Sequence, residues 1–323
     1  MFDIVIMGHL CLDIVHYEET NKLKERTIKE KNEEKPLFLG GPPAYAGLTT
    51  VKLGASVGIV SVVGKDFPEE YLHFLASKNI DISGVNKRGD HSTKFVHNYT
   101  RNGERFSKLI TTAEEINKKD IPEIYLKARS FLISPVMHEI SPDFISWLRK
   151  SVGKRPLIGV DPQGFLRMIN PDGTVYLECL IDFDEIMRYA DILSPSEEEA
   201  FAITKIKRNN LDEIINVLKK KQKGIFLITR GSEGSIVIDI KERKKTVFKI
   251  PPCKPKKVVD TTGAGDAFLA AFIIKHLWSE DVLQSARVAS AATSFLIEEK
   301  GTSGFASLEQ VETRLKEQYD EEK

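Results

Sequence analysis

The sequence predicts an α/β protein: a three-layer α/β/α arrangement with a mostly parallel central sheet. Short apolar runs typical of buried strands alternate with helical segments in the first 85 residues and again after residue 121. Such strand–helix repeats build parallel sheets with helices on both faces. Between residues 93 and 110 the pattern changes to alternation on both sides of Asn102-Gly103. That change predicts a β-hairpin inserted among the strand–helix units.

Composition and charge favour a folded intracellular protein. Of the 323 residues 41% are hydrophobic, and Lys+Arg and Asp+Glu both number 47. A balanced charge gives no reason to expect a nucleic-acid or membrane-surface partner. The three cysteines show no metal or disulfide spacing, which favours a reducing compartment. The chain starts with a strand pattern and has no uncharged apolar run of about 18 residues, so we expect a cytoplasmic protein.

The first half of the chain begins with a strand over residues 4–7 and ends with the hairpin. Asp13 follows that strand at its carboxyl end, where open α/β sheets bind ligands. Two interpretations are open: the Asp13 carboxylate binds substrate, or Asp13 is an ordinary loop aspartate. Residues 18–35 carry mixed charges, typical of a solvated face or an exposed strand. Gly40-Gly41 opens a helix whose first turn tolerates the prolines that follow. Further apolar periodicity predicts a strand over 56–63, a helix over 71–77 and a strand over 80–85.

The second half returns to strand–helix alternation. Apolar runs predict strands over 130–134, 156–160 and 224–229, an antiparallel pair over 235–240 and 245–250, and the end of a strand at 257–259. Helical patterns cover residues 142–150, 186–190, 211–221, 267–277 and 286–297. The charged tail, 320–323, is expected to fray.

The segment Asp260-Thr261-Thr262-Gly263-Ala264-Gly265-Asp266 is the centre of the functional argument. A glycine turn that opens a helix leaves backbone N–H groups unpaired at the positive end of the helix dipole, which makes an anion site. Asp266 falls in the first helical turn, where a carboxylate can take a proton from a nucleophile beside the anion. Phosphoryl transfer needs both parts. The plain alternative is a strand-to-helix turn with a capping aspartate.

That string resembles the C-terminal signature of the ribokinase-like (PfkB) family of carbohydrate and nucleoside kinases. The resemblance implies that Gly263, Ala264 and Gly265 hold the γ-phosphate of ATP while Asp266 acts as general base. It implies that Mg²⁺ bridges the phosphates, and that Asp260 and Thr262 support the turn or a K⁺ ion. It also implies one ribokinase-like domain over residues 1–323, with a small β-sheet lid formed by roughly 11–38 and 91–111.

Further segments match the family pattern in the expected order. Gly40-Gly41 and Asp13 match substrate contacts of the family. Tyr45 stands where the family has an asparagine, and two interpretations are open: its ring stacks on the substrate, or it packs in the core. Arg167 follows the strand over 156–160. The resemblance implies that it faces phosphate, and the alternative is a surface arginine. Gln163, in the same segment, departs from the family pattern. The matches to nucleotide and Mg²⁺ contacts are Ser196, Glu199, Thr229, Gly231, Ser232, Gly234 and Ser290; without the resemblance, Ser196 and Glu199 are simply a capping box.

The resemblance implies an ATP-dependent kinase that phosphorylates an alcohol group of a sugar or polyol. The absence of Gly-x4-Gly-Lys-Ser/Thr and of an early Gly-x-Gly-x-x-Gly argues against a P-loop kinase and a dinucleotide dehydrogenase. The Tyr45 variant is compatible with an inositol-kinase-like branch. The alternatives are a nucleoside kinase of the cytidine or adenosine type and a non-catalytic metabolite-binding protein. Exposed lid edges favour a homodimer through two lids.

Overall fold

The structure, a computed structural model, describes residues 1–17, 37–99, 105–181, 183–206, 210–220, 223–242 and 244–320. The charged segment 18–35, most of the first lid segment, and the Asn102-Gly103 turn lie outside these described residues. Within the described part of the chain, no helix is long and apolar enough to cross a membrane.

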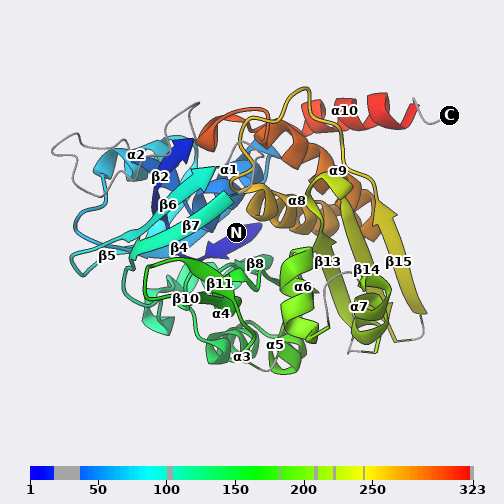
Figure 1. The fold of residues 1–323 in the computed structure, drawn as a ribbon, viewed down its shortest axis with the longest axis horizontal. Coiled ribbons are helices and arrows are strands. Elements are labelled where there is room, and N and C mark those ends of the chain that lie inside the picture. Colours follow the sequence, from blue (N-terminus) through cyan, green and yellow to red (C-terminus); the bar gives the residue numbers. More distant parts are fainter. Residues whose placement is uncertain are drawn as a thin grey trace.

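A nine-stranded sheet forms the centre of the molecule, as the sequence predicts (Figure 1). It is parallel from β13 to β5, and β14 and β15 extend it antiparallel. In spatial order its strands are β15 (Lys244–Ile250), β14 (Ser235–Lys241), β13 (Gly224–Thr229), β12 (Ile192–Leu193), β9 (Leu157–Val160), β8 (Ser130–Ile133), β1 (Ile4–Met7), β4 (Val57–Val63) and β5 (Ile80–Lys87).

Helices cover both faces of this sheet because each central strand is apolar on both sides. In β1, Ile4 and Ile6 pack into one core, and Val5 and Met7 pack into the other. The first core includes residues of α1 (Pro42–Lys52), α2 (Glu69–Ser77), α8 (Ala264–Ser279), α9 (Val282–Leu296) and α10 (Leu308–Asp320). The second includes residues of α3 (Pro142–Val152), α4 (Gln163–Leu166), α5 (Phe183–Tyr189), α6 (Glu197–Thr204) and α7 (Leu211–Leu218).

A separate four-stranded sheet, which we call the lid, lies beside the main sheet. Its order is β3 (Phe38–Gly40), β2 (Cys11–Tyr17), β6 (Thr93–Tyr99) and β7 (Arg105–Thr111). The β6–β7 pair is antiparallel, as the hairpin pattern predicts, whereas β2 and β6 run parallel. A short hairpin of β10 (Arg167–Ile169) and β11 (Val175–Leu177) meets the lid where Leu109 N donates to Gly173 O at 3.0 Å.

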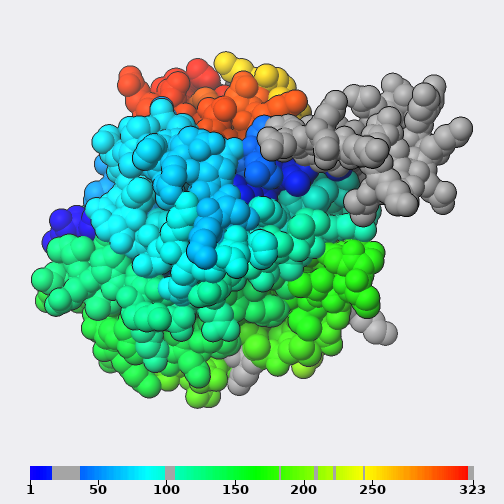
Figure 2. Space-filling view, turned by 90° about the vertical axis from the view of Figure 1, so that its left-hand side faces the viewer, coloured from blue at the N-terminus to red at the C-terminus, as the bar shows by residue number. Residues whose placement is uncertain are grey.

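The molecule seen from its β5 end shows how these layers stack. In Figure 2 the cyan segment of α2 and β5 lies between orange C-terminal residues above and green residues of the chain's middle below. Short 3₁₀ turns complete the described chain at Lys118–Asp120, Glu123–Lys127, Gly231–Glu233 and Gly301–Ser303.

One predicted element is wrong. Residues 257–259 do not end a strand: β15 ends at Ile250, and the chain then runs without regular structure to α8. Pro251, Pro252 and Pro255 explain the difference, because proline lacks the N–H that a sheet ladder requires. Val259 N instead donates to Ile297 O at 2.8 Å, which ties this segment to the end of α9.

Candidate active site

A cleft of about 440 Å³ opens where the lid, the carboxyl ends of the parallel strands and the start of α8 meet. Parallel α/β sheets bind ligands at this edge. The structure brings most of the predicted site residues to its walls: Asp13, Gly41, Tyr45, Arg167, Ser196, Glu199, Thr229, Thr262, Gly263, Ala264, Gly265 and Asp266.

The glycine turn before α8 is built as an anion site requires. Gly263 is the N-cap of α8 with φ of +76°, a left-handed conformation that favours glycine. Asp260 braces the turn, since its Oδ1 accepts from Thr262 N at 2.9 Å and its Oδ2 accepts from Gly301 N at 3.1 Å. The buried helix that follows directs its positive end into the cleft.

Tyr45 packs directly against this turn. A Cβ on Gly263 would lie 2.2 Å from the Tyr45 ring, and Tyr45 itself is only 3% exposed. The ring belongs to a small core with Ala267 and Leu296. Of the two interpretations of the sequence, the packed one describes this position, although Tyr45 also borders the cleft. The position where the family pattern has an asparagine thus holds a packed ring that supports the Gly263 turn.

Asp266 meets a side chain that sequence analysis missed. Ser134, at the end of β8, donates its hydroxyl to Asp266 Oδ1 at 3.4 Å. Gln163 Nε2 lies 3.4 Å from the same hydroxyl, and Arg167 Nη2 lies 2.6 Å from Gln163 Oε1. No local pattern signals this group, because its members come from separate strand ends. Arg167 lines the cleft, where its guanidinium donates to Gln163 and to the carbonyl of Val136 and lies 5.9 Å from the centre of the Phe95 ring; its contact with phosphate stays a prediction.

Asp161 and Glu199 form an acidic group beside the start of α8. Burial raises the pKa of the Asp161 carboxyl well above its ordinary value, and the negative charges of Glu199 and Asp266 raise it further. Burial also raises the pKa of Glu199. Ser196 and Glu199 make the expected capping box: Ser196 N donates to Glu199 Oε2 at 2.8 Å and Glu199 N donates to Ser196 Oγ at 3.2 Å.

This acidic group suits a divalent cation that is shared with phosphates. Carboxylates crowded by burial and by one another are stabilised by added positive charge. Among the described residues, no group of three or more His, Cys, Asp or Glu is arranged to hold a metal alone. Mg²⁺ is usually held by one or two carboxylates, waters and substrate phosphates, and Asp161 and Glu199 supply two carboxylates to the cleft.

The lid side of the cleft contains Asp13 on strand β2, not in a loop. Its Oδ1 is buried without a hydrogen-bond partner in the described chain, and His97 Nε2 lies 3.4 Å away. Ser107 Oγ lies 2.8 Å from the other ring nitrogen of His97. Gly40 is required here because a Cβ would stand 2.0 Å from Asp13 Oδ2. A buried carboxylate oxygen facing a cleft suits a substrate hydroxyl.

Four predicted nucleotide contacts do not line this cleft: Gly231, Ser232, Gly234 and Ser290. The three loop residues lie in and after the 3₁₀ turn that follows Thr229, and Gly231 and Gly234 have positive φ values of +53° and +83°. Ser290 accepts a hydrogen bond from Cys253 N at 2.9 Å, which connects α9 to the segment after β15. Their assignment to the nucleotide stays a prediction.

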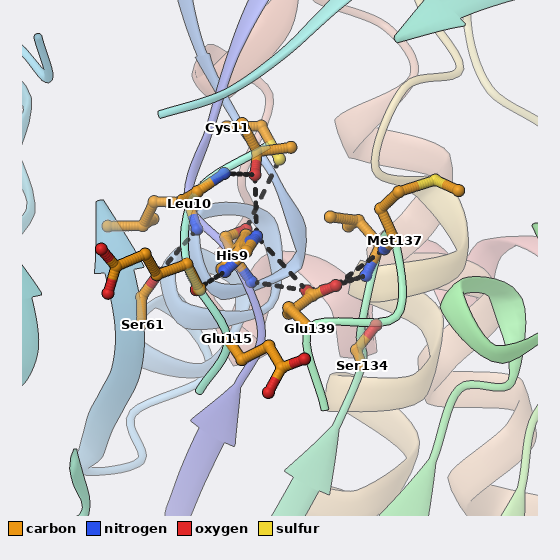
Figure 3. A network of polar contacts seen from close by, with 12 residues as sticks. His9, Leu10, Cys11, Ser61, Glu115, Ser134, Met137 and Glu139 are labelled. Carbon is orange, nitrogen blue, oxygen red and sulfur yellow. Dashed lines mark hydrogen bonds and ion pairs between the residues drawn. The ribbon is translucent and has the colours of Figure 1, made fainter. Parts of the chain in front are cut away.

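A buried polar network joins the lid to the main sheet (Figure 3). Glu139 accepts hydrogen bonds from the backbone N–H groups of His9, Val136 and Met137 at 2.7 to 3.0 Å. The His9 ring contacts Thr93 Oγ1 at 2.7 Å, at the first residue of lid strand β6. The network thus anchors the lid to the ends of β1 and β8.

Known proteins resemble this chain over most of its length. The model of the pfkB family carbohydrate kinases matches residues 1–138 and 167–309. A cytidine kinase of Thermococcus kodakarensis is 29% identical over 278 residues, 84% of this chain and 88% of that protein. Two solved structures share the fold, each with a TM-score of 0.75. Arabidopsis thaliana ribokinase, complexed with ribose and ATP, is 23% identical and the match covers 98% of this chain and 99% of that one. A pyrophosphate-dependent kinase, complexed with a pyrophosphate analog and myo-inositol, is 20% identical with 96% and 99% covered.

Proposed function

This chain belongs to the pfkB family of carbohydrate kinases, and we propose that it transfers the γ-phosphate of ATP to an alcohol group of a sugar or polyol. The observation that carries the proposal is the placement of Asp266 in the first turn of α8, directly after the Gly263 turn and in the same cleft as Asp13. In the proposal, the Gly263 turn is the anion site, Asp266 the base and Asp13 the hydroxyl-binding carboxylate of this one cleft.

In the proposed mechanism Asp13 accepts a hydrogen bond from an acceptor hydroxyl and thereby orients the substrate. The N–H groups of the turn over residues 263–265 stabilise negative charge on the transferred phosphoryl group. Asp266 takes the proton of the attacking hydroxyl. Closing of the lid over the cleft excludes water, which would otherwise compete as acceptor.

Mg²⁺, with Glu199 holding it through water and Asp161 nearby, would neutralise charge on the donor phosphates. A K⁺ ion near Asp260 and Thr262 is a second cation in the proposal. The two oxygens of Asp260 already accept backbone N–H groups, which favours its role in bracing the turn.

A nucleoside is the second candidate acceptor, because the Thermococcus kodakarensis relative is a cytidine kinase. The lid side of the cleft includes flat groups suited to a ring: Phe95 stacks on His97 with ring centroids 5.8 Å apart, and both line the cavity. The donor also has an alternative, since one structural neighbour is pyrophosphate-dependent.

The experiment is a turnover panel with Mg²⁺. ATP and pyrophosphate are each offered with myo-inositol, ribose, fructose, 2-keto-3-deoxygluconate, cytidine and adenosine, and ADP or phosphate release is measured. We expect turnover with ATP and one sugar or polyol. Turnover with cytidine or adenosine alone would make the chain a nucleoside kinase. Binding of metabolites without turnover would favour a non-catalytic metabolite-binding protein.

A further inference from the structure

We infer that Ser134 is a positioning residue for Asp266, and that it is held in this role by a directed chain of hydrogen bonds from Arg167 through Gln163. The inference rests on the proposed function, in which Asp266 is the general base. Its evidence is four side chains, each in hydrogen-bond contact with the next. The family resemblance assigns no role to Ser134, and Gln163 departs from the family pattern.

The direction of each hydrogen bond follows from the first residue. Arg167 has only donors, so the carboxamide oxygen of Gln163 must face it, at 2.6 Å from Nη2. The Gln163 Nε2 group then donates to Ser134 Oγ at 3.4 Å. A serine hydroxyl has a single proton, and Ser134 directs it to Asp266 Oδ1 at 3.4 Å.

Asp161 supports the same orientation of Gln163. Its Oδ2 lies 3.3 Å from Gln163 Nε2, and its Oδ1 accepts from the backbone N–H of Gln163 at 2.9 Å. When Asp161 is ionised it only accepts, so a flipped carboxamide would place oxygen against oxygen here. In either state of Asp161 a flip would also place nitrogen against the donors of Arg167, so Arg167 selects this arrangement.

The fold holds Ser134 in place independently of its hydroxyl. Ser134 is fully buried directly after β8, and its N–H donates to Met7 O at 2.9 Å. Glu139 fixes the loop that follows by accepting from the N–H groups of Val136 and Met137 (Figure 3). The backbone position of Ser134 is thus set without its hydroxyl.

A donor on Asp266 Oδ1 has two consequences for a general base. It stabilises the ionised carboxylate relative to the protonated one, whereas the neighbouring Asp161 carboxyl repels the charge on Asp266 and acts in the opposite direction. The Ser134 hydroxyl thereby keeps the base active at lower pH. It also holds the carboxylate in one orientation toward the attacking hydroxyl, and a small misplacement of a reacting group lowers the rate. Removing the hydroxyl should change kcat and its pH dependence more than substrate binding.

The test compares Ser134→Ala with Ser130→Ala in the full chain, using the acceptor that the panel identifies. Ser130 is a matched control: it is buried at the opposite end of β8, and its hydroxyl donates to Asp3 O at 2.7 Å. For Ser134→Ala we expect kcat to fall about tenfold, as for loss of a hydrogen bond to a charged group. We expect the acid limb of the kcat/KM profile to move up by about 0.5 pH units, with both KM values changing less than about twofold. Ser130→Ala should show neither change.

A second comparison shows whether Ser134 acts through Asp266. In an Asp266→Asn background, Ser134→Ala should cause no further loss of kcat, because effects of residues that act as a unit are not additive. Gln163→Met, at a half-buried position, tests the upstream link should Ser134→Ala fail to fold. It should move the acid limb in the same direction by a smaller amount.

The outcomes separate this inference from the function on which it rests. A wild-type chain without acceptor-dependent turnover would overturn the proposed function, and full turnover in Asp266→Asn would overturn the assignment of the base. If both hold, the inference is overturned by an unmoved acid limb in Ser134→Ala or in Gln163→Met. The inference is also overturned if Ser134→Ala lowers kcat by the same factor in the wild type and in Asp266→Asn.

Discussion

Asp266 lies in the same cleft as the Gly263 turn and Asp13, so in the proposed mechanism its carboxylate should govern the chemical step. We expect Asp266→Asn to lower kcat by about 10²–10⁴, the usual contribution of a general base. Both KM values should stay close to those of the wild type, since the amide keeps the shape of the carboxylate. Steady-state kinetics measure this, with Asp90→Asn as control because Asp90 pairs with Lys65 on the surface. Wild-type turnover in Asp266→Asn would exclude this base.

Gly263 combines a left-handed backbone with a tight contact, and a matched glycine separates the two. Gly54 also has a positive φ, +91°, in the left-handed turn that ends α1, where Ala55 N donates to Thr50 O and Gly54 N donates to Val51 O, but nothing lies within 4 Å of its added Cβ. Gly54→Ala should lose about 1–2 kcal/mol of unfolding free energy from the backbone alone. Gly263→Ala should lose more, because the Tyr45 ring must move, and kcat should fall with it. Urea unfolding and kinetics measure both; equal losses of stability would mean that the Tyr45 contact adjusts freely.

The pKa of Asp161 makes stability depend on pH in a defined direction. Its carboxyl has a raised pKa in the folded protein, so stability is fully present below the unfolded pKa of about 3.9 and is lost as pH rises. Asp161→Asn removes this loss. We expect the variant to melt at a higher temperature than the wild type at pH 7.5, with a gain that shrinks toward pH 4.

Asp172 provides the opposite case for this measurement. Hydrogen bonds from Thr174 lower the pKa of the Asp172 carboxyl, so its contribution is present above the unfolded pKa and is lost in acid. Asp172→Asn should therefore lower the melting temperature slightly at pH 7.5. A gain for Asp172→Asn, or no gain for Asp161→Asn, would contradict the expected directions.

At the scale of elements, α6 begins with a cap that also borders the cleft. Ser196 Oγ accepts from Glu199 N, and in α7 Asn210 makes the same kind of cap on Glu213 N, also at 3.2 Å. Each alanine variant should lose about 1 kcal/mol of unfolding free energy. Only Ser196→Ala should also raise the KM for the phosphate donor, because Asn210 does not line the cleft. If the KM for the phosphate donor is the same in both variants, Ser196 is only a helix cap and does not contact the donor.

The lid shows how far an element can be derived from local pattern. The β6–β7 hairpin follows from alternating residues, whereas the parallel pairing of β2 with β6 joins strands about 80 residues apart and has no local signature. Likewise the predicted strand at 257–259 fails because three prolines nearby outweigh a short apolar run. The β10–β11 hairpin, which positions Arg167, was not predicted at all.

At the scale of the molecule, the homodimer through the lid stays a prediction that can be tested. The lid bears large exposed apolar side chains on its two outer strands: Phe38 on β3, and Phe106 and Ile110 on β7, 47–58% exposed. We expect a dimer in sedimentation velocity that Phe106→Lys weakens, because apolar patches of this kind pair to exclude water. Trp278→Lys, on α8 away from the lid, should leave the oligomeric state unchanged. A monomeric wild type would contradict the prediction.

The layered α/β fold and the kinase family could both be predicted from the amino-acid sequence. Both follow from short-range information: apolar runs show which strands are buried on two faces, and the spacing from Asp260 to Asp266 specifies a turn with its helix start. The resemblance also led to Asp13 and Glu199, which both line the cleft, and their roles toward substrate and Mg²⁺ stay predictions.

How these motifs contact one another depends on the folded arrangement of distant parts of the chain. It placed Tyr45 against Gly263, His97 beside Asp13, and Ser134 on Asp266, although the last two residues are 132 positions apart. Contacts of this kind depend on the register of strand ends and on the packing of side chains from separate elements. Neither the register nor the packing can be predicted from a local sequence pattern. The side chains that support Asp266, Gly263 and Asp13 are therefore visible only in the folded chain.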